Sequence, residues 1–167
     1  TADATVNSVT VGKGANSATG NTVLGESALD ASVTGTNNTA IGKNTLTQLT
    51  TGANNTAVGS ESLDAVTTGA NNTAIGYQAM TDQTTGSDNS AFGKGALANN
   101  TTANSNCAFG SNALFTQTSS GTKNSAFGSA TLYSNTTGDS NVAIGDASLY
   151  TNTTGSENIA IGDYAMG

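Results

Sequence analysis

The chain has 167 residues, of which 11 are acidic and four are basic, so its net charge is −7. This balance argues against nucleic acid or an anionic membrane as a partner, because both attract basic proteins. Leu, Ile, Val and Phe together number 26, about 16% of the chain, fewer than an ordinary globular core needs. No segment approaches the ~18 apolar residues of a membrane-spanning helix.

The first part of the chain, residues 1–20, differs from the rest. It includes Ser8–Gly12, a short S-V-T-V-G segment that ends in glycine, and the next glycine of this kind is Gly25. The interval between these two glycines is shorter than the interval that recurs in the remainder of the chain. We therefore expect residues 1–20 to form a shortened first coil, or a transition into the array that follows.

Residues 21–167 consist of nine copies of a 17-residue unit, each with one anchor glycine after a short apolar segment. The spacing of the anchors is 17 everywhere except for one gap of 18, which places the extra residue in a return loop at 115–120. Such a fixed period is typical of a solenoid, so we expect one continuous rod. The anchors are Gly25, Gly42, Gly59, Gly76, Gly93, Gly110, Gly128, Gly145 and Gly162.

Most positions of the unit, T-T-G-x-x-N-[TS]-A-[IVF]-G-x-x-[AS]-L-x-x-x, have a physical rationale. The apolar segment before the anchor is too short for a helix and suits a strand closed by a tight turn. A second short strand is expected around the Leu or Met at the fourth position after the anchor. These features predict an all-β fold, a parallel β-roll of 17-residue coils with two short strands per coil.

Stacked coils place like residues on like, about 4.7–4.9 Å apart, so nine coils would form a rod of roughly 40 Å. The Asn at the fourth position before each anchor is expected to form a ladder of side-chain amides. A lone stack this thin looks marginal, because each coil offers about two large apolar side chains. Association of copies around a shared axis would bury the Ala-lined face as well.

The motifs Asn72–Gly76 (N-T-A-I-G) and Asn141–Gly145 (N-V-A-I-G) resemble the S-V-A-I-G repeats of trimeric autotransporter adhesin heads. Those heads are left-handed parallel β-rolls that form homotrimers with a shared core. The longer unit, as in Asn72–Met80 and Leu149–Gly155, is similar to arrays found in bacteriophage tail fibres. The resemblance implies a homotrimeric, extracellular fibre segment, on a virion tail or a bacterial cell surface, that supports host attachment.

No constellation of catalytic residues is visible, so we expect no enzyme activity and no catalytic, cofactor-binding or metal site. The sequence has no histidine, and its one cysteine, Cys107, occupies a position held by Thr or Ser in other units, such as Thr39 and Ser90. The acidic residues are scattered singly, and Asp146 and Asp163, which share a position in the unit, are expected to face solvent rather than bind calcium.

Two outward features leave alternative functions open. The Thr pairs of the return loop, such as Thr67-Thr68, would form a flat array of the kind found in ice-binding solenoids, although Thr also suits exposed turns. Tyr77, Phe115, Tyr133 and Tyr150 lie on or near the Leu segment and are candidates for a carbohydrate-contacting strip. An ice-binding solenoid and a glycan-binding adhesin head are therefore alternatives to a passive shaft.

Overall fold

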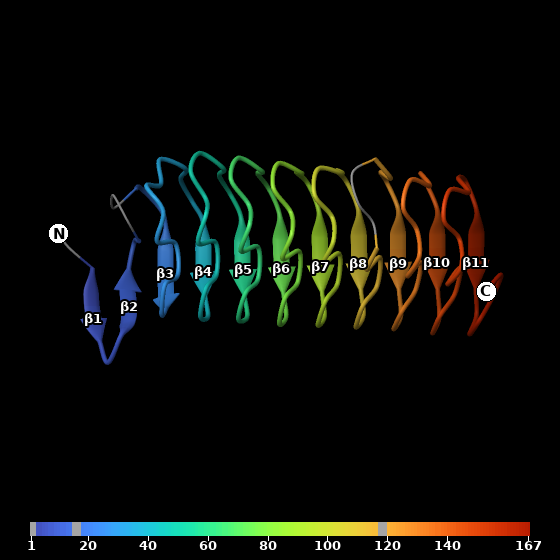
Figure 1. Ribbon diagram of the computed structural model, residues 1–167, viewed down its shortest axis with the longest axis horizontal. Helices are drawn as coiled ribbons and strands as arrows, with labels where there is room; N and C mark the ends of the chain where they lie inside the picture. The colour runs from blue at the N-terminus through green and yellow to red at the C-terminus, as the bar shows by residue number, and fades with distance from the viewer. Residues whose placement is uncertain (1–2, 15–17, 117–119) are drawn as a thin grey trace.

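The computed structural model describes residues 3–14, 18–116 and 120–167. These residues form a single 11-stranded sheet in which the strands follow one another in chain order (Figure 1). The strands are β1 (Ala4–Val6), β2 (Val9–Gly12), β3 (Thr22–Gly25), β4 (Thr39–Ile41), β5 (Thr56–Val58), β6 (Thr73–Ile75), β7 (Ser90–Phe92), β8 (Cys107–Phe109), β9 (Ser125–Phe127), β10 (Val142–Ile144) and β11 (Ile159–Ile161). No helix long and apolar enough to cross a membrane occurs among the described residues.

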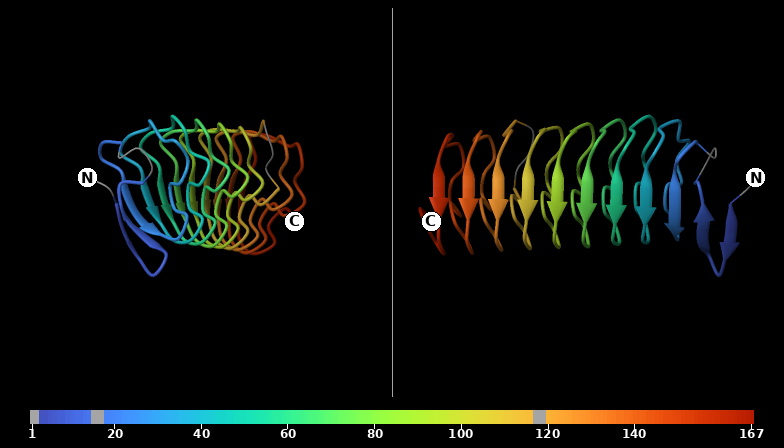
Figure 2. Two further views of the ribbon diagram at one scale, coloured as in Figure 1. Left: turned by 60° about the vertical axis from the view of Figure 1, so that its left-hand side comes forward. Right: turned by 180° about the vertical axis from the view of Figure 1, so that it is seen from behind.

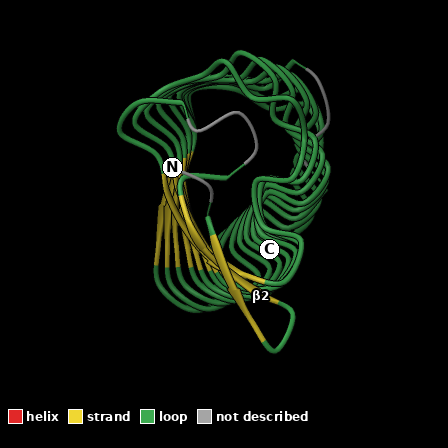
Figure 3. Ribbon diagram, turned by 90° about the vertical axis from the view of Figure 1, so that its left-hand side faces the viewer, coloured by secondary structure: helices red, strands yellow, loops and turns green. Residues whose placement is uncertain are grey.

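From β3 onward the chain is a parallel β-solenoid, with one strand per coil and every neighbouring pair in register (Figures 1 and 2). Ala40 pairs with Ala57, and Ile41 pairs with Val58. Viewed along the stack, successive coils repeat one outline with the strands on one side (Figure 3). The predicted parallel stacking of like on like is confirmed. The extra residue at 115–120 falls partly outside the described residues, but β8 and β9 stay in phase across it.

The described part of residues 1–20 contains a hairpin, where the sequence suggested a shortened first coil or a transition into the array. Strands β1 and β2 pair antiparallel, and β2 also pairs antiparallel with β3. Asn7 and Ser8 form the turn with φ of 48° and 67°, the left-handed values that a tight two-residue hairpin requires. The Asp3 carboxylate accepts a hydrogen bond from the Lys13 backbone N–H at 2.8 Å. The hairpin therefore extends the sheet without completing a coil.

Each coil has one strand rather than the two we expected, because the Leu segment is built from turns. In the coil that follows Gly59, Glu61 and Leu63 have φ of 59° and 50°. The Glu61 N–H donates to the Lys43 carbonyl oxygen of the preceding coil at 2.9 Å, and the Leu63 N–H donates to the Ala79 carbonyl oxygen of the following coil at 3.0 Å. The two left-handed residues of this turn therefore donate their N–H groups to different coils, one to the preceding coil and one to the following coil.

The core lies inside each coil, between the Ala of the strand and the Leu of the turn segment. Ala57, Ala74, Leu63 and Met80 are fully buried. The expectation that the Ala-lined face would be left for other copies is therefore wrong. Successive side chains of a strand point to opposite faces, so an Ala that faces inward sends its apolar neighbour outward. The thin interior has room for Ala beside Leu, and the larger Ile and Phe side chains lie on the outer face.

Candidate functional site

The interior of the solenoid contains the predicted ladder of asparagines, which we call the inner asparagine ladder. The Asn72 Nδ2 donates to the Asn55 Oδ1 at 3.1 Å and to the Gly86 carbonyl oxygen at 2.9 Å. The Asn72 Oδ1 accepts from the Asn89 backbone N–H at 3.0 Å. The buried members are Asn21, Asn38, Asn55, Asn72, Asn89, Asn106, Asn124 and Asn141.

The inner asparagine ladder satisfies its own buried hydrogen-bonding groups. Within the described ranges, every buried side-chain nitrogen and oxygen has a hydrogen-bond partner. A buried amide that is fully paired stabilises the stack, whereas an unpaired buried polar group costs free energy. The ladder is therefore a structural device, and it offers no buried polar atom to a ligand.

The outer face of the sheet presents a continuous line of apolar side chains, which we call the apolar stripe. Ile75, Phe109, Phe127 and Ile144 are between 36% and 41% exposed. The rings of Phe92, Phe109 and Phe127 stack along it, with successive centroids 4.3 and 5.1 Å apart. The stripe consists of Leu24, Ile41, Val58, Ile75, Phe92, Phe109, Phe127, Ile144 and Ile161. The strands that carry it lie along one side of the coils (Figure 3).

The Thr pairs of the return loops divide into two roles. The first Thr of a pair bonds to the next coil, as where the Thr67 Oγ1 donates to the Thr84 carbonyl oxygen at 3.2 Å and the Thr84 Oγ1 donates to the Thr101 carbonyl oxygen at 3.0 Å. The second Thr is exposed, as at Thr68 and Thr85. Half of each pair therefore takes part in holding the coils together.

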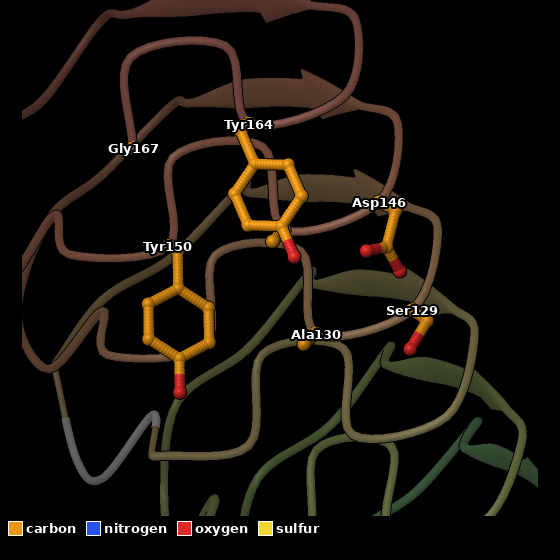
Figure 4. Close-up of a pocket in the computed structure, with 7 residues that line it drawn as sticks. Ser129, Ala130, Asp146, Tyr150, Tyr164 and Gly167 are labelled. Carbon is orange, nitrogen blue, oxygen red and sulfur yellow. The ribbon is translucent and has the colours of Figure 1, made fainter.

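The aromatic residues near the Leu segment form a stack. Phe115, Tyr133 and Tyr150 stack on one another with ring centroids 5.2 and 5.1 Å apart. Tyr77 occupies a different position of its unit, directly after the anchor Gly76, and is 47% exposed. At the end of the stack a cavity opens, in which Tyr150 and Tyr164 lie side by side (Figure 4). Sequence reasoning missed this cavity, although the replacement of an aromatic by Gly167, one period after Tyr150, marks it.

The remaining polar candidates are not brought together into a reactive cluster. Asp146 and Asp163 are both exposed, and the Asp146 N–H donates to the Asp163 Oδ1 at 3.2 Å. Among the described residues no group of three or more Cys, Asp or Glu side chains is placed to hold a metal ion. Cys107 lies on the outer face of β8, between Ser90 and Ser125 on the neighbouring strands, and burial raises the pKa of its thiol.

No protein-family model, curated protein or solved structure matches this chain. The features of the solenoid that bear on its function are the apolar stripe, the inner asparagine ladder and the cavity beside Tyr150.

Proposed function

We propose that this chain is a shaft or head segment of an extracellular homotrimeric fibre of the tail-fibre type, which supports attachment to a host. Its role is mechanical: it holds an attachment point away from the particle or cell on a stiff rod. The observation that carries this proposal is the apolar stripe, together with the in-register stack on which it is displayed.

Stiffness is supported by the way in which each coil is tied to its neighbours. Coils are joined by strand pairing, by the inner asparagine ladder and by bonds between return loops, such as that from the Thr50 Oγ1 to the Thr67 carbonyl oxygen at 3.0 Å. Such bonds recur along the array, in which neighbouring strands are roughly 4.8 Å apart. The absence of proline suits such ladders, because proline cannot donate to them.

Self-association is supported by the period of the apolar stripe. An exposed, continuous apolar surface marks an interaction site. A partner that covers the stripe along its length must present apolar groups at the same axial spacing. A second copy of the chain in parallel alignment has this spacing, because its own stripe also has one residue per coil. Cyclic symmetry about an axis parallel to the rod would bring the stripes of identical chains together. The choice of three chains follows the resemblance to trimeric adhesin heads and tail-fibre arrays.

The proposal is tested by light scattering of the chain at micromolar concentration. We expect a particle with three times the 16.3 kDa mass of one chain. The double variant Ile75→Asp, Ile144→Asp places two charges in the stripe and should fall to the monomer mass. The matched control Thr68→Asp, Thr137→Asp changes two exposed loop residues and should stay trimeric. A stable wild-type monomer, or a double stripe variant that stays associated, would contradict the proposal.

A further inference from the structure

The outer face of strand β7, the middle strand of the parallel array, is flanked by residues of opposite charge (Figure 1). Asp88 comes two residues before the first residue of the strand, and Lys94 comes two residues after its last, and both are exposed. Between them Ser90 and Phe92 face outward, while the buried Ala91 faces the core. One edge of this face therefore has an acid beside a small residue, and the other has a base beside a large aromatic residue.

Neither charge is neutralised by an ion pair of its own chain. Among the described residues Lys94 forms no salt bridge, whereas the Lys43 ammonium group pairs with the Glu26 carboxylate at 3.2 Å. The Asp88 Oδ1 accepts a hydrogen bond from the Asn71 Nδ2 at 3.0 Å. A carboxylate has acceptor sites on both oxygens, so its other oxygen can accept from an ammonium group. Both charges are therefore available to another chain.

The combination of an acid at one edge and a base at the other occurs in this unit alone. At the two equivalent positions the other units have at most one charged residue, except for the last, which has two acids, Glu157 and Asp163. The other units form the same parallel pairing without such a combination. The coil therefore does not need Asp88 and Lys94 in order to fold, which leaves them free to act between chains.

The sizes of the outward side chains follow a second rule. Each strand of the array has two outward positions, one in the apolar stripe and one two residues earlier. Where the stripe has Phe, the earlier position has Ser90, Cys107 or Ser125, and in every other unit it has a β-branched Thr, Val or Ile. The row of stacked Phe rings thus runs beside a row of small residues. Phe109 and Phe127 are still 36% and 40% exposed, so their own chain does not cover them.

The alignment of the chains decides which edges of this face meet. Two rods that are related by an axis along the rod are parallel, and opposite edges of their outer faces come together. Lys94 of one chain then meets Asp88 of the next, and the Phe row of one lies against the small row of the other. Antiparallel rods, related by an axis along the strands, would bring like edges together. Charge and side-chain size therefore both favour the parallel arrangement.

We propose that the chains of the fibre are held parallel and in register by a contact between Lys94 of each chain and Asp88 of the next. Beside this contact, the Phe row of one chain packs on the row of small residues of its neighbour. This inference rests on the proposed self-association through the apolar stripe and adds what fixes the alignment. Apolar burial is non-directional, whereas complementary charges select one register. The partner that fits this surface is a second copy of the same chain.

The test reverses each charge with a residue type that the repeat already has at that position. Lys123 occupies the Asp88 position with φ of 58° against 61°, and Asp146 occupies the Lys94 position. Asp88→Lys and Lys94→Asp each make the contact repulsive at every interface, so at low ionic strength association should weaken at least about tenfold. The double variant Asp88→Lys, Lys94→Asp exchanges the signs and should associate as the wild type does. The matched control Asp82→Lys makes the same change of charge in the Leu segment and should leave association unchanged.

Association is measured by sedimentation equilibrium over a dilution series that extends below the concentration at which the wild type dissociates. Circular dichroism checks that each variant keeps its coils. An equimolar mixture of Asp88→Lys and Lys94→Asp chains should associate more tightly than either variant alone, because in a mixed trimer two of the three contacts join Lys to Asp.

Single variants that associate as tightly as the wild type would overturn this inference and leave the trimer in place. The same conclusion would follow if neither the double variant nor the mixture restored association. A monomeric wild type would instead remove the proposed fibre, and this inference with it. The mass of the wild type and the response to charge reversal therefore separate the two failures.

Discussion

Replacement of Asn72 by alanine tests whether the inner asparagine ladder holds the coils together. Asn72 is fully buried and lies near the middle of the array. Its side chain donates to Asn55 and to Gly86, and it accepts from the backbone and side chain of Asn89. Alanine removes all four of these bonds at once.

The expected cost follows from the groups left behind. The Asn89 backbone N–H loses its acceptor, whereas the Gly86 carbonyl oxygen keeps the bond that the Gln83 Nε2 donates at 2.7 Å. Each buried polar group left unpaired costs about 1–3 kcal/mol. The Asn55 Oδ1 keeps the Asn72 backbone N–H at 3.0 Å, so its loss is smaller. With one group left unpaired and the other bonds lost from groups that keep a partner, we expect Asn72→Ala to lower the free energy of unfolding by about 2–4 kcal/mol.

The measurement is urea unfolding followed by far-ultraviolet circular dichroism at one fixed chain concentration. The matched control is Asn71→Gly, which alters the neighbouring exposed asparagine and preserves its left-handed backbone at φ 60°. Asn71 bonds to the exposed Asp88 carboxylate at 3.0 Å, and water can replace that bond. The control should change stability by less than about 1 kcal/mol. If Asn72→Ala costs no more than the control, the ladder does not hold the coils as we describe.

Three further changes probe other parts of the coil. Gly76→Ala should cost at least about 2 kcal/mol in a thermal melt, because Gly76 has φ 138° and an added Cβ would lie 2.5 Å from the Gly93 carbonyl oxygen; an unchanged melting temperature would contradict this. Leu63→Ala should cost about 2–5 kcal/mol in urea by emptying the fully buried Leu position, and a loss below about 1 kcal/mol would mean that the coil collapses around the gap. Burial raises the pKa of the Cys107 thiol, so the folded chain holds less of the reactive thiolate at pH 8 than the unfolded chain. Iodoacetamide should therefore modify the folded chain more slowly than the urea-unfolded chain, as followed by mass spectrometry. Equal rates would show that the thiol is not protected.

The sequence predicted the period, the parallel stacking and the asparagine ladder because each depends on residues that recur at one spacing. Asn at the same position in nine units allows few other arrangements of its amide. The direction of the strand faces was harder to predict. In a segment such as Asn72–Gly76 either Ala74 or Ile75 could face inward, and the larger residue looked like the core. The structure shows that the smaller Ala74 faces inward. The interior is thin, and Met80 and its equivalents already fill the space that a second large side chain would need.

The repeat located the Leu segment but did not predict its backbone conformation, which is a turn and not a strand. Leucine is rare at positive φ, so the Leu position suggested a strand. Gly95, which takes the place of Glu61 and Gln78 in its own unit, was a sign of a left-handed corner there. The cavity beside Tyr150 was harder still to predict, because it depends on the residue missing from one unit and not on what the units share.

The most direct test of the account is a cross-linking measurement at the centre of the apolar stripe. Phe109→Cys in a Cys107→Ser background would be treated to completion with a short bis-maleimide and analysed on a denaturing gel. If three chains meet through their stripes, two should be joined and the third left over, so one third of the protein should remain monomeric. Thr68→Cys in the same background, on the return loop, should give no cross-link. Monomer alone from the Phe109→Cys chain, or complete conversion to dimer, would contradict a trimer built on the stripe.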